Sequence, residues 1–354
     1  GDMRRVYWAR SARVAPGSEG SERATATDPL PPSATLAERA QYTRRMSPIT
    51  RGRQVVEVKP YLTDAFTDEA VRFIGARQAQ PFFLYIAYNA PHTPLQATRK
   101  YIDRYRHVED KGTRVYAAMV SALDDGVGAI RAKLKAEGLE RDTLIVFLSD
   151  NGCAAYILGA CSNAPLNGFK ASHLEGGVRV PYIVTWPGAI PGGKVDDRQV
   201  SSLDIVPTAA ALAGARLANG SDGVNLMPYL VGGDKRTPNP TLYWRAGPNF
   251  AIRDGQWKMW KANKAPPGAE PSGSARVTPD GTHARVSEHG QHVMLYDLKA
   301  DLGETTNVAS RRPEVVAGLQ AKLDAWNATL VPPQWTSMRQ SLKKQDGQTL
   351  QLYD

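Results

Sequence analysis

Continuous apolar runs of strand length alternate with helical patterns in the first two-thirds of the chain. Residues 81–88, 143–148 and 178–186 are apolar and rich in β-branched or aromatic side chains, which is typical of strands buried on both faces. Between the first two runs, residues 116–137 have a helical spacing that stops at Gly138. This alternation predicts an α/β core with a mainly parallel central sheet flanked by helices.

Helical spacing also fixes which side chains we expect in the core. In the 116–137 helix the apolar stripe is Val120, Leu123, Val127, Ile130 and Leu134. A helix beginning near Thr63 to Thr67, where hydroxyl and acidic side chains favour a helix start, is expected to bury Ala70, Val71, Phe73 and Ile74. Two more helices are predicted over 201–213 and 314–326.

The pattern changes after Gly214. Short strand-like pieces separated by turn residues predict a smaller antiparallel sheet, over 242–245, 249–253, 256–261 and 292–297. Residues 263–290 are rich in Pro, Gly and Ser and indicate a loop. We therefore expect four parts: an irregular Arg- and Pro-rich segment (1–54), the α/β core (55–235), a C-terminal antiparallel sheet with a terminal helix (236–330) and a tail (331–354).

Polar residues gather where two of the predicted strands end. Asp150, Asn151 and Gly152 follow the 143–148 run; the side-chain oxygens suit a divalent cation, although the same residues also make ordinary turns. Lys170 lies on the returning segment and offers a positive charge for an oxyanion. His92, which stands between two prolines after the 81–88 run, is either a structural hydrogen-bonding residue or part of a site.

Composition narrows the class of protein only slightly. The 354 residues carry a formal net charge of +9, which favours an acidic partner. The basic residues are scattered and no nucleic-acid module is recognisable, so we expect no nucleic-acid partner. No apolar run approaches the roughly 18 residues of a membrane span, and no signal peptide is evident at the N-terminus. Cys153 and Cys161, the two cysteines, form either a disulfide or a pair of free thiols.

The motifs occur in an order that resembles one known family. Leu148-Ser149-Asp150-Asn151-Gly152, then Lys170, then the run Leu-Glu-Gly-Gly-Val-Arg-Val-Pro over 174–181, are similar to the type I, formylglycine-dependent sulfatases of the alkaline phosphatase superfamily. The phrases around 61–70, 91–94, 204–208 and 295–308 are similar as well. The resemblance implies an alkaline phosphatase-like fold and hydrolysis of sulfuric esters.

The same resemblance assigns roles to individual residues. It implies that Asp150 and Asn151 are ligands of one Ca²⁺ ion and that Lys170 neutralises the sulfate oxygens. His92 is expected to contact the sulfate ester and assist the leaving group, and His173 is placed with the substrate-binding residues. The implied substrate is a small sulfate ester or a sulfated carbohydrate. The implied location is periplasmic or extracellular, whereas the oligomeric state stays open.

One part of the family pattern does not occur. The family makes its formylglycine from Cys/Ser-x-Pro-x-Arg, but Cys161 is followed by Ser-Asn-Ala-Pro, and the early Asp-Asp and Lys-x-His motifs do not occur either. We expect a fragment that is inactive in isolation, or a partner-completed or degenerate sulfatase. The alternatives are a phosphodiesterase or phosphonate hydrolase of the same superfamily, and a non-catalytic protein that binds sulfated glycans.

Overall fold

The computed structural model describes most of the chain after residue 48. The described residues are 22–23, 49–76, 80–154, 157, 159–217, 220–265, 267, 276–277, 290–331 and 339–353. Most of the predicted segment 1–54 and most of the predicted loop 263–290 therefore lie outside them. The chain divides into two compact units, Gly1–Thr143 with Trp186–Ala189, and Leu144–Thr185 with Ile190–Asp354. These limits differ from the predicted domain limits, which stay predictions.

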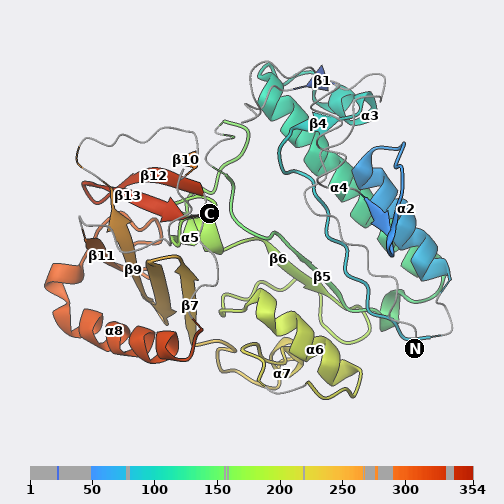
Figure 1. Cartoon of the computed structure of the whole chain (residues 1–354). Coiled ribbons are helices and arrows are strands. Elements are labelled where there is room, and N and C mark those ends of the chain that lie inside the picture. The colour runs from blue at the N-terminus through green and yellow to red at the C-terminus, as the bar shows by residue number, and fades with distance from the viewer. Residues whose placement is uncertain are drawn as a thin grey trace. The chain divides into compact units, whose positions relative to one another are not determined.

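Two helices packed side by side form the centre of the first unit. Helix α2 (Leu62–Gly75) packs along α4 (Lys111–Ala136) (Figure 1). At their contact a Cβ added at Gly126 would lie 2.5 Å from the Thr67 hydroxyl oxygen, so only glycine allows this approach. Thr67, predicted near the helix start, instead lies inside α2, where its hydroxyl donates to the carbonyl oxygen of Thr63 at 3.0 Å.

The buried stripe of α4 differs from the predicted one. Val120 is 41% exposed, whereas Leu134 is buried as predicted. The core face runs instead through Val115, Ala118, Met119, Ala122 and Gly126. Small residues take this face because α2 approaches closely, and apolar spacing alone does not show which of two neighbouring stripes a partner helix covers.

The predicted strand over 81–88 is extended, but no ladder with another described residue forms. Its side chains alternate as in a strand: Phe83 is 63% and Tyr85 72% exposed, whereas Phe82, Leu84 and Ile86 are half-buried. The sequence therefore predicted the extended backbone, but a strand also needs hydrogen bonds to the N–H and C=O groups of a neighbouring strand.

The other helices and strands of this unit are short: β1 (Glu22–Arg23) paired with β4 (Gln96–Ala97), β2 (Thr50–Arg51) paired with β3 (Gln54–Val55), and α3 (Arg99–Ile102).

The second unit begins with the strand pair that carries the candidate site. Strand β5 (Ile145–Leu148) pairs with β6 (Tyr182–Thr185), Leu148 opposite Tyr182. The pair is antiparallel, in contrast to the predicted parallel arrangement, because residues 149–181 return directly beside β5 without the crossover that parallel pairing requires. This return includes the short helix α5 (Glu175–Val178). Helices α6 (Ile205–Leu212) and α7 (Met227–Leu230) follow.

The predicted antiparallel sheet forms the C-terminal part of this unit. Its strands are β7 (Thr241–Ala246), β8 (Asn249–Asp254), β9 (Trp257–Lys264), β10 (Arg276–Val277), β11 (Gln291–Asp297), β12 (Arg339–Gln345) and β13 (Gln348–Tyr353). The order is β10-β12-β13-β9-β8-β7, and β11 also pairs with β9. Residues 339–353, predicted as part of a tail, thus form a hairpin of this sheet. Leu350 and Leu352 are fully buried on either side of Gln351, a period-2 pattern too short to be distinctive in a polar sequence.

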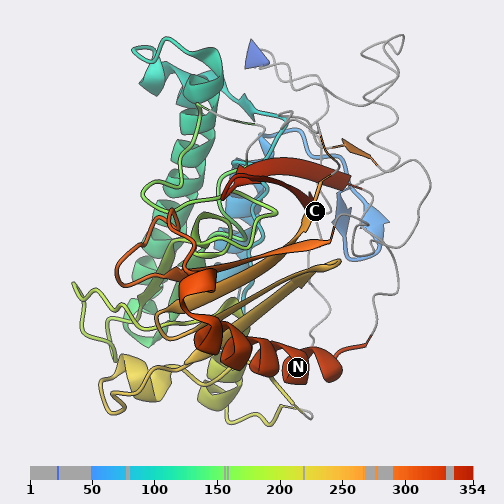
Figure 2. The same cartoon turned by 90° about the vertical axis from the view of Figure 1, so that its left-hand side faces the viewer.

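The predicted terminal helix is α8 (Pro313–Ala328), which lies across one face of the sheet (Figure 2). Its buried residues Leu319 and Leu323 pack against Ile252, Met259 and Leu295 of the strands. The helix and the strands therefore share one apolar core.

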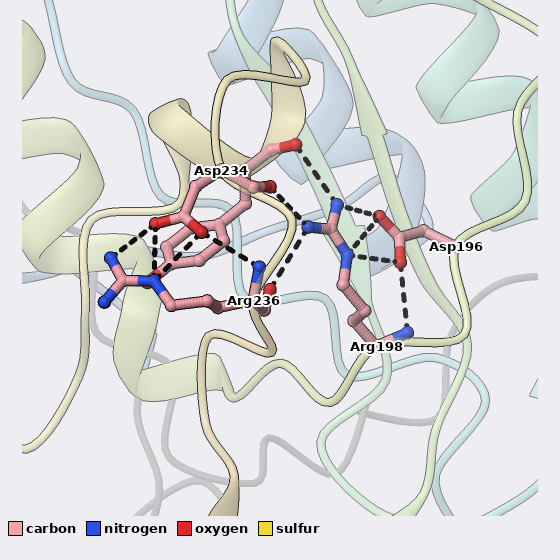
Figure 3. Close-up of polar contacts among 5 residues, drawn as sticks. Asp196, Arg198, Asp234 and Arg236 are labelled. Carbon is pink, nitrogen blue, oxygen red and sulfur yellow. Dashed lines mark hydrogen bonds and ion pairs between the residues drawn. The ribbon is translucent and has the colours of Figure 1, made fainter.

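An arginine holds together two loops of the second unit. Arg198 donates to the carbonyl oxygens of Tyr229 (3.1 Å) and Asp234 (2.9 Å), and it pairs with the Asp196 carboxylate (Figure 3). Arg236 makes its own exposed pair with Asp234, and its hydrogen bonds lower the pKa of that carboxyl to about 2. The Arg198 contacts hold the loop after α7 against the segment that precedes α6.

We expect Leu323→Ala to lower the free energy of unfolding by about 2 to 5 kcal/mol, because the side chain is 2% exposed and its removal leaves a cavity under α8. Urea denaturation followed by tryptophan fluorescence measures this change. The matched control Leu330→Ala, at a position that is 37% exposed, is expected to change it by about 0.5 kcal/mol or less. Equal effects of the two substitutions would contradict the packing of α8.

Candidate functional site

The predicted metal-binding pair lies directly after β5. The N–H of Gly152 donates to the carbonyl oxygen of Gly177 at 3.1 Å, and a Cβ added at Gly152 would lie 1.8 Å from the carbonyl oxygen of Gly176. Glycine at 152 is thus required where the two segments meet. Asp150 is exposed and Asn151 half-buried, and neither side chain is hydrogen-bonded to a described residue. Their oxygens are therefore available to a ligand.

Lys170 is tied by its backbone to the same turn. Its N–H donates to the carbonyl oxygen of Cys153 at 3.0 Å, two residues after Asn151. The loop around it is tight: Ala171 has a left-handed backbone with φ of 74°, and the Ser172 hydroxyl accepts from the N–H of Phe169 at 3.0 Å. The hydrogen bond to Cys153 places the lysine segment beside the strand end that carries Asp150 and Asn151.

The side chain of Asn163 joins these two segments. Its Oδ1 accepts from the N–H of Cys153 at 2.8 Å, and its Nδ2 donates to the carbonyl oxygens of Cys153 (3.3 Å) and Gly168 (3.0 Å). Sequence reasoning assigned no role to this residue. An Asn that stands just after Cys161 and two residues before a proline is the available signal, and it is weak because such residues are common in turns.

A disulfide closes the loop between the two segments. Cys153 and Cys161 are bonded to each other, with their Cα atoms 6.0 Å apart. The structure thus decides between the two alternatives that the sequence left open. The bond begins at the residue whose carbonyl oxygen accepts from Lys170, so it limits the freedom of the candidate site itself.

His173 lies in the core behind the site. It is 6% exposed and packs edge-on against Trp260, with ring centres 6.5 Å apart. Burial, together with the charge of Lys258, lowers the pKa of His173 to about 3, so the imidazole is neutral at physiological pH. Its predicted contact with substrate stays a prediction.

A buried ion cluster fixes the end of the returning segment. Glu175 is 1% exposed and pairs with Arg253 of β8 (2.7 Å) and Lys258 of β9 (2.9 Å). Burial acts to raise the pKa of the Glu175 carboxyl, but the two cations outweigh it and hold the pKa below its usual value. Sequence reasoning did not give Glu175 a role. The carboxylate of Glu175, which follows Leu174 at the start of the run 174–181, is the signal that could have indicated a buried pair.

His92 belongs to the other compact unit. Its side chain is exposed, and its Nδ1 lies 2.6 Å from the carbonyl oxygen of Thr93. The structure therefore brings together Asp150, Asn151 and Lys170 in one unit. The expectation that His92 and Lys170 contact the same sulfate group stays a prediction.

The donor set after β5 is compatible with a hard cation but supplies few ligands. A carboxylate and an amide oxygen are the ligand types that Ca²⁺ prefers, and the ion takes six to eight oxygens. Within the described ranges no three His, Cys, Asp or Glu side chains come together as a metal site. Asp150 and Asn151 would hold one side of the ion.

Comparison with known proteins identifies the family. The model of the sulfatase family matches residues 17–215, more than half of the chain. The chain belongs to the sulfatase family. Mouse steryl-sulfatase is 34% identical over 292 residues, which cover 77% of this chain and 45% of that protein. Human arylsulfatase A is 34% identical over 267 residues, covering 70% and 50%. The chain spans about half the length of the curated sulfatases it matches.

Solved structures show the same relationship. The structure of Ps i-CgsB in complex with k-i-k-neocarrahexaose has a TM-score of 0.70 and 32% identity, and the match covers 85% of this chain and 63% of that one. A Bacteroides thetaiotaomicron sulfatase structure has a TM-score of 0.63 and 26% identity, covering 80% and 57%. These sulfatases have the alkaline phosphatase-like fold, which confirms the predicted fold class. In the described part of the chain, no helix combines the length and apolar character needed to cross a membrane.

We expect Asn163→Ala to loosen the contact between the two site segments. Removing a buried hydrogen-bonding group costs about 1 to 3 kcal/mol, which corresponds to roughly 5- to 150-fold faster hydrogen exchange at the amides of Cys153 and Lys170. Exchange followed by mass spectrometry measures this effect. Ser162→Ala, an exposed neighbour, is the control and is expected to leave both amides unchanged. Unaltered exchange in Asn163→Ala would show that the side chain does not hold the segments.

Proposed function

We propose that the complete protein hydrolyses sulfate esters. The observation that carries this proposal is the hydrogen bond between the Lys170 amide and the Cys153 carbonyl. It brings the lysine expected to bind sulfate and the oxygen pair expected to bind Ca²⁺ onto adjoining segments. Membership of the sulfatase family supports the reaction class, and the identity of 30% or more with several sulfatases supports it further.

The proposed chemistry divides between a cation, a lysine and a histidine. Asp150 and Asn151 would hold Ca²⁺, which when bound supplies positive charge to the sulfate oxygens. The Lys170 ammonium adds a second positive charge and orients the sulfate group. His92 would donate a proton to the departing alcohol oxygen, a role that imidazole side chains often take in general acid catalysis. No residue of the printed sequence lies in a Cys/Ser-x-Pro-x-Arg motif, so the nucleophile is assigned to none of them.

A sulfated carbohydrate is the proposed substrate class. The likeness to Ps i-CgsB, which covers 85% of this chain and was solved with a neocarrahexaose, supports this choice. The net charge of +9 is compatible with an anionic chain. The disulfide supports a periplasmic or extracellular location, because such bonds persist in oxidising compartments.

Binding tests the site on the 354-residue chain. We expect inorganic sulfate to bind more tightly in the presence of Ca²⁺, and Lys170→Ala to weaken that binding by roughly 10- to 150-fold, because a hydrogen bond to a charged group contributes about 1.5 to 3 kcal/mol. Isothermal titration calorimetry measures both constants. Lys299→Ala, at an exposed position of the same unit, is the control. If the affinity for sulfate is the same with and without Ca²⁺, the result favours a non-catalytic glycan-binding protein. If the chain binds inorganic phosphate more tightly than sulfate, the result favours a phosphodiesterase.

Activity tests the assignment of the reaction. The 354-residue chain alone is expected to release no sulfate from an aryl sulfate, because no residue supplies the covalent nucleophile. In a protein completed with a formylglycine-bearing segment, Lys170→Ala and His92→Ala are each expected to lower kcat/KM by orders of magnitude. A colorimetric aryl sulfatase assay measures these rates. Turnover by the chain alone that survives both His92→Ala and calcium chelation would show that the assigned chemistry is wrong.

A further inference from the structure

Glu304 lies in a strained and fully buried turn after β11. It is 0% exposed, and its φ of 49° is in the left-handed region that non-glycine residues seldom adopt. The turn is fixed from the other side by Asp301, whose carboxylate accepts from the N–H groups of Thr305 and Thr306, both at 2.8 Å. A turn held in this way gives the Glu304 side chain one direction.

Glu304 contacts the Lys170 segment at both of its ends. The Glu175 N–H donates to the Glu304 carboxylate at 2.7 Å, and the Asn167 amide donates to the Glu304 carbonyl oxygen at 3.3 Å. Lys170 lies between these two positions, three residues after Asn167. Gln345 supports the same carbonyl oxygen at 3.0 Å. One residue, in the turn after β11, therefore contacts both ends of the loop that carries Lys170.

The carboxyl group of Glu304 has an unusual electrostatic environment. Its Oε1 is buried and has no hydrogen-bond partner among the described residues. Burial raises its pKa to about 7, although the charge of Lys258 and the Glu175 N–H act in the opposite direction. The titratable groups that face it are Lys258 on β9, Glu175 on α5, Tyr296 on β11, Lys343 on β12 and Asp301 in its own turn.

We propose that Glu304 is a positioning residue for Lys170, holding both ends of residues 167–175 so that the lysine is presented to a sulfate group. The proposal rests on the proposed function only for the identity of the anion. The alternative is that Glu304 merely fills space in the sheet core. That alternative predicts that any loss of order in Glu304 variants would spread evenly over the neighbouring strands.

The direction of the pH effect follows from the raised pKa. When the segment opens and Glu304 meets water, its pKa returns towards the ordinary value of about 4.3. The closed state therefore binds more protons between about pH 4.3 and pH 7. The contribution of Glu304 to closure is fully present below that window and is lost as the pH rises through it. His173 in the same segment acts in the opposite direction below about pH 6.5, because burial lowers its pKa to about 3 and opening lets it take up a proton. The Glu304 contribution is therefore the difference between the wild-type chain and Glu304→Gln, and in that difference opening should become easier from pH 5 to pH 8.

Hydrogen exchange on the 354-residue chain tests the proposal, with the amides of Glu175 and Lys170 as reporters and those of β8 and β9 as internal standards. Glu304→Ala is expected to raise exchange in 167–175 by at least tenfold while the strands stay protected. Glu304→Gln retains an acceptor for the Glu175 N–H, so it is expected to keep the segment protected and to remove the Glu304 part of the pH dependence, which leaves the opposite effect of His173. Glu314→Gln, the same change at an exposed position of α8, is the control.

Each outcome decides the question. Equal loss of protection in the segment and in the strands, or no loss at all, overturns the proposal, as does a pH dependence of opening that is the same in Glu304→Gln as in the wild-type chain. If Glu304→Ala does not fold, Asn167→Ala replaces it: selective exchange at 167–175 supports the proposal and unchanged exchange overturns it. Titration of inorganic sulfate into the same variants tests the proposed sulfatase function separately from the proposed role of Glu304. Failure of the wild-type chain to bind sulfate contradicts the function, whereas the exchange pattern still decides the role of Glu304.

Discussion

The second unit depends on one rule of electrostatics, that a buried charge must be paired. Arg253 and Lys258 stand directly opposite each other on β8 and β9, and like charges in that position repel. Glu175 lies between them and pairs with both. Removing one member of such a buried group costs about 3 to 5 kcal/mol, because the others are left uncompensated. The strand hairpin thus requires the carboxylate that the returning segment brings.

This pairing explains why a sheet far along the sequence bears on the candidate site. Glu175 is the first residue of α5, and its N–H is capped by Glu304 from the turn after β11. The segment that carries Lys170 is consequently held by the C-terminal sheet at its end and by Asn163 and the disulfide at its beginning. A lysine on a loop held at both ends loses less conformational entropy when it binds an anion than one on a free loop.

The sulfatase chemistry proposed for this chain therefore relies on two kinds of residue. Asp150, Asn151 and Lys170 would contact the ion and the sulfate, and their side chains are exposed or half-buried. Asn163 and Glu304 face inward and bind backbone groups of the site segments, and Glu175 faces inward and pairs with buried side chains of the sheet. Because directional hydrogen bonds fix the backbone more narrowly than apolar packing does, the inward-facing residues define where the outward-facing ones can be.

The sequence alone determined the family, the helices and most strands of the C-terminal sheet, because apolar period and ordered motifs are local signals. It also predicted Asp150, Asn151 and Lys170 as site residues, because they stand in the motifs themselves. It did not show that the β5–β6 pair is antiparallel, that Val120 faces outward or that 339–353 form a hairpin. Those features depend on which partner covers a given face. Only the tertiary structure shows the pairing of Glu175 with Arg253 and Lys258, since it joins charges 78 or more residues apart that no local pattern connects.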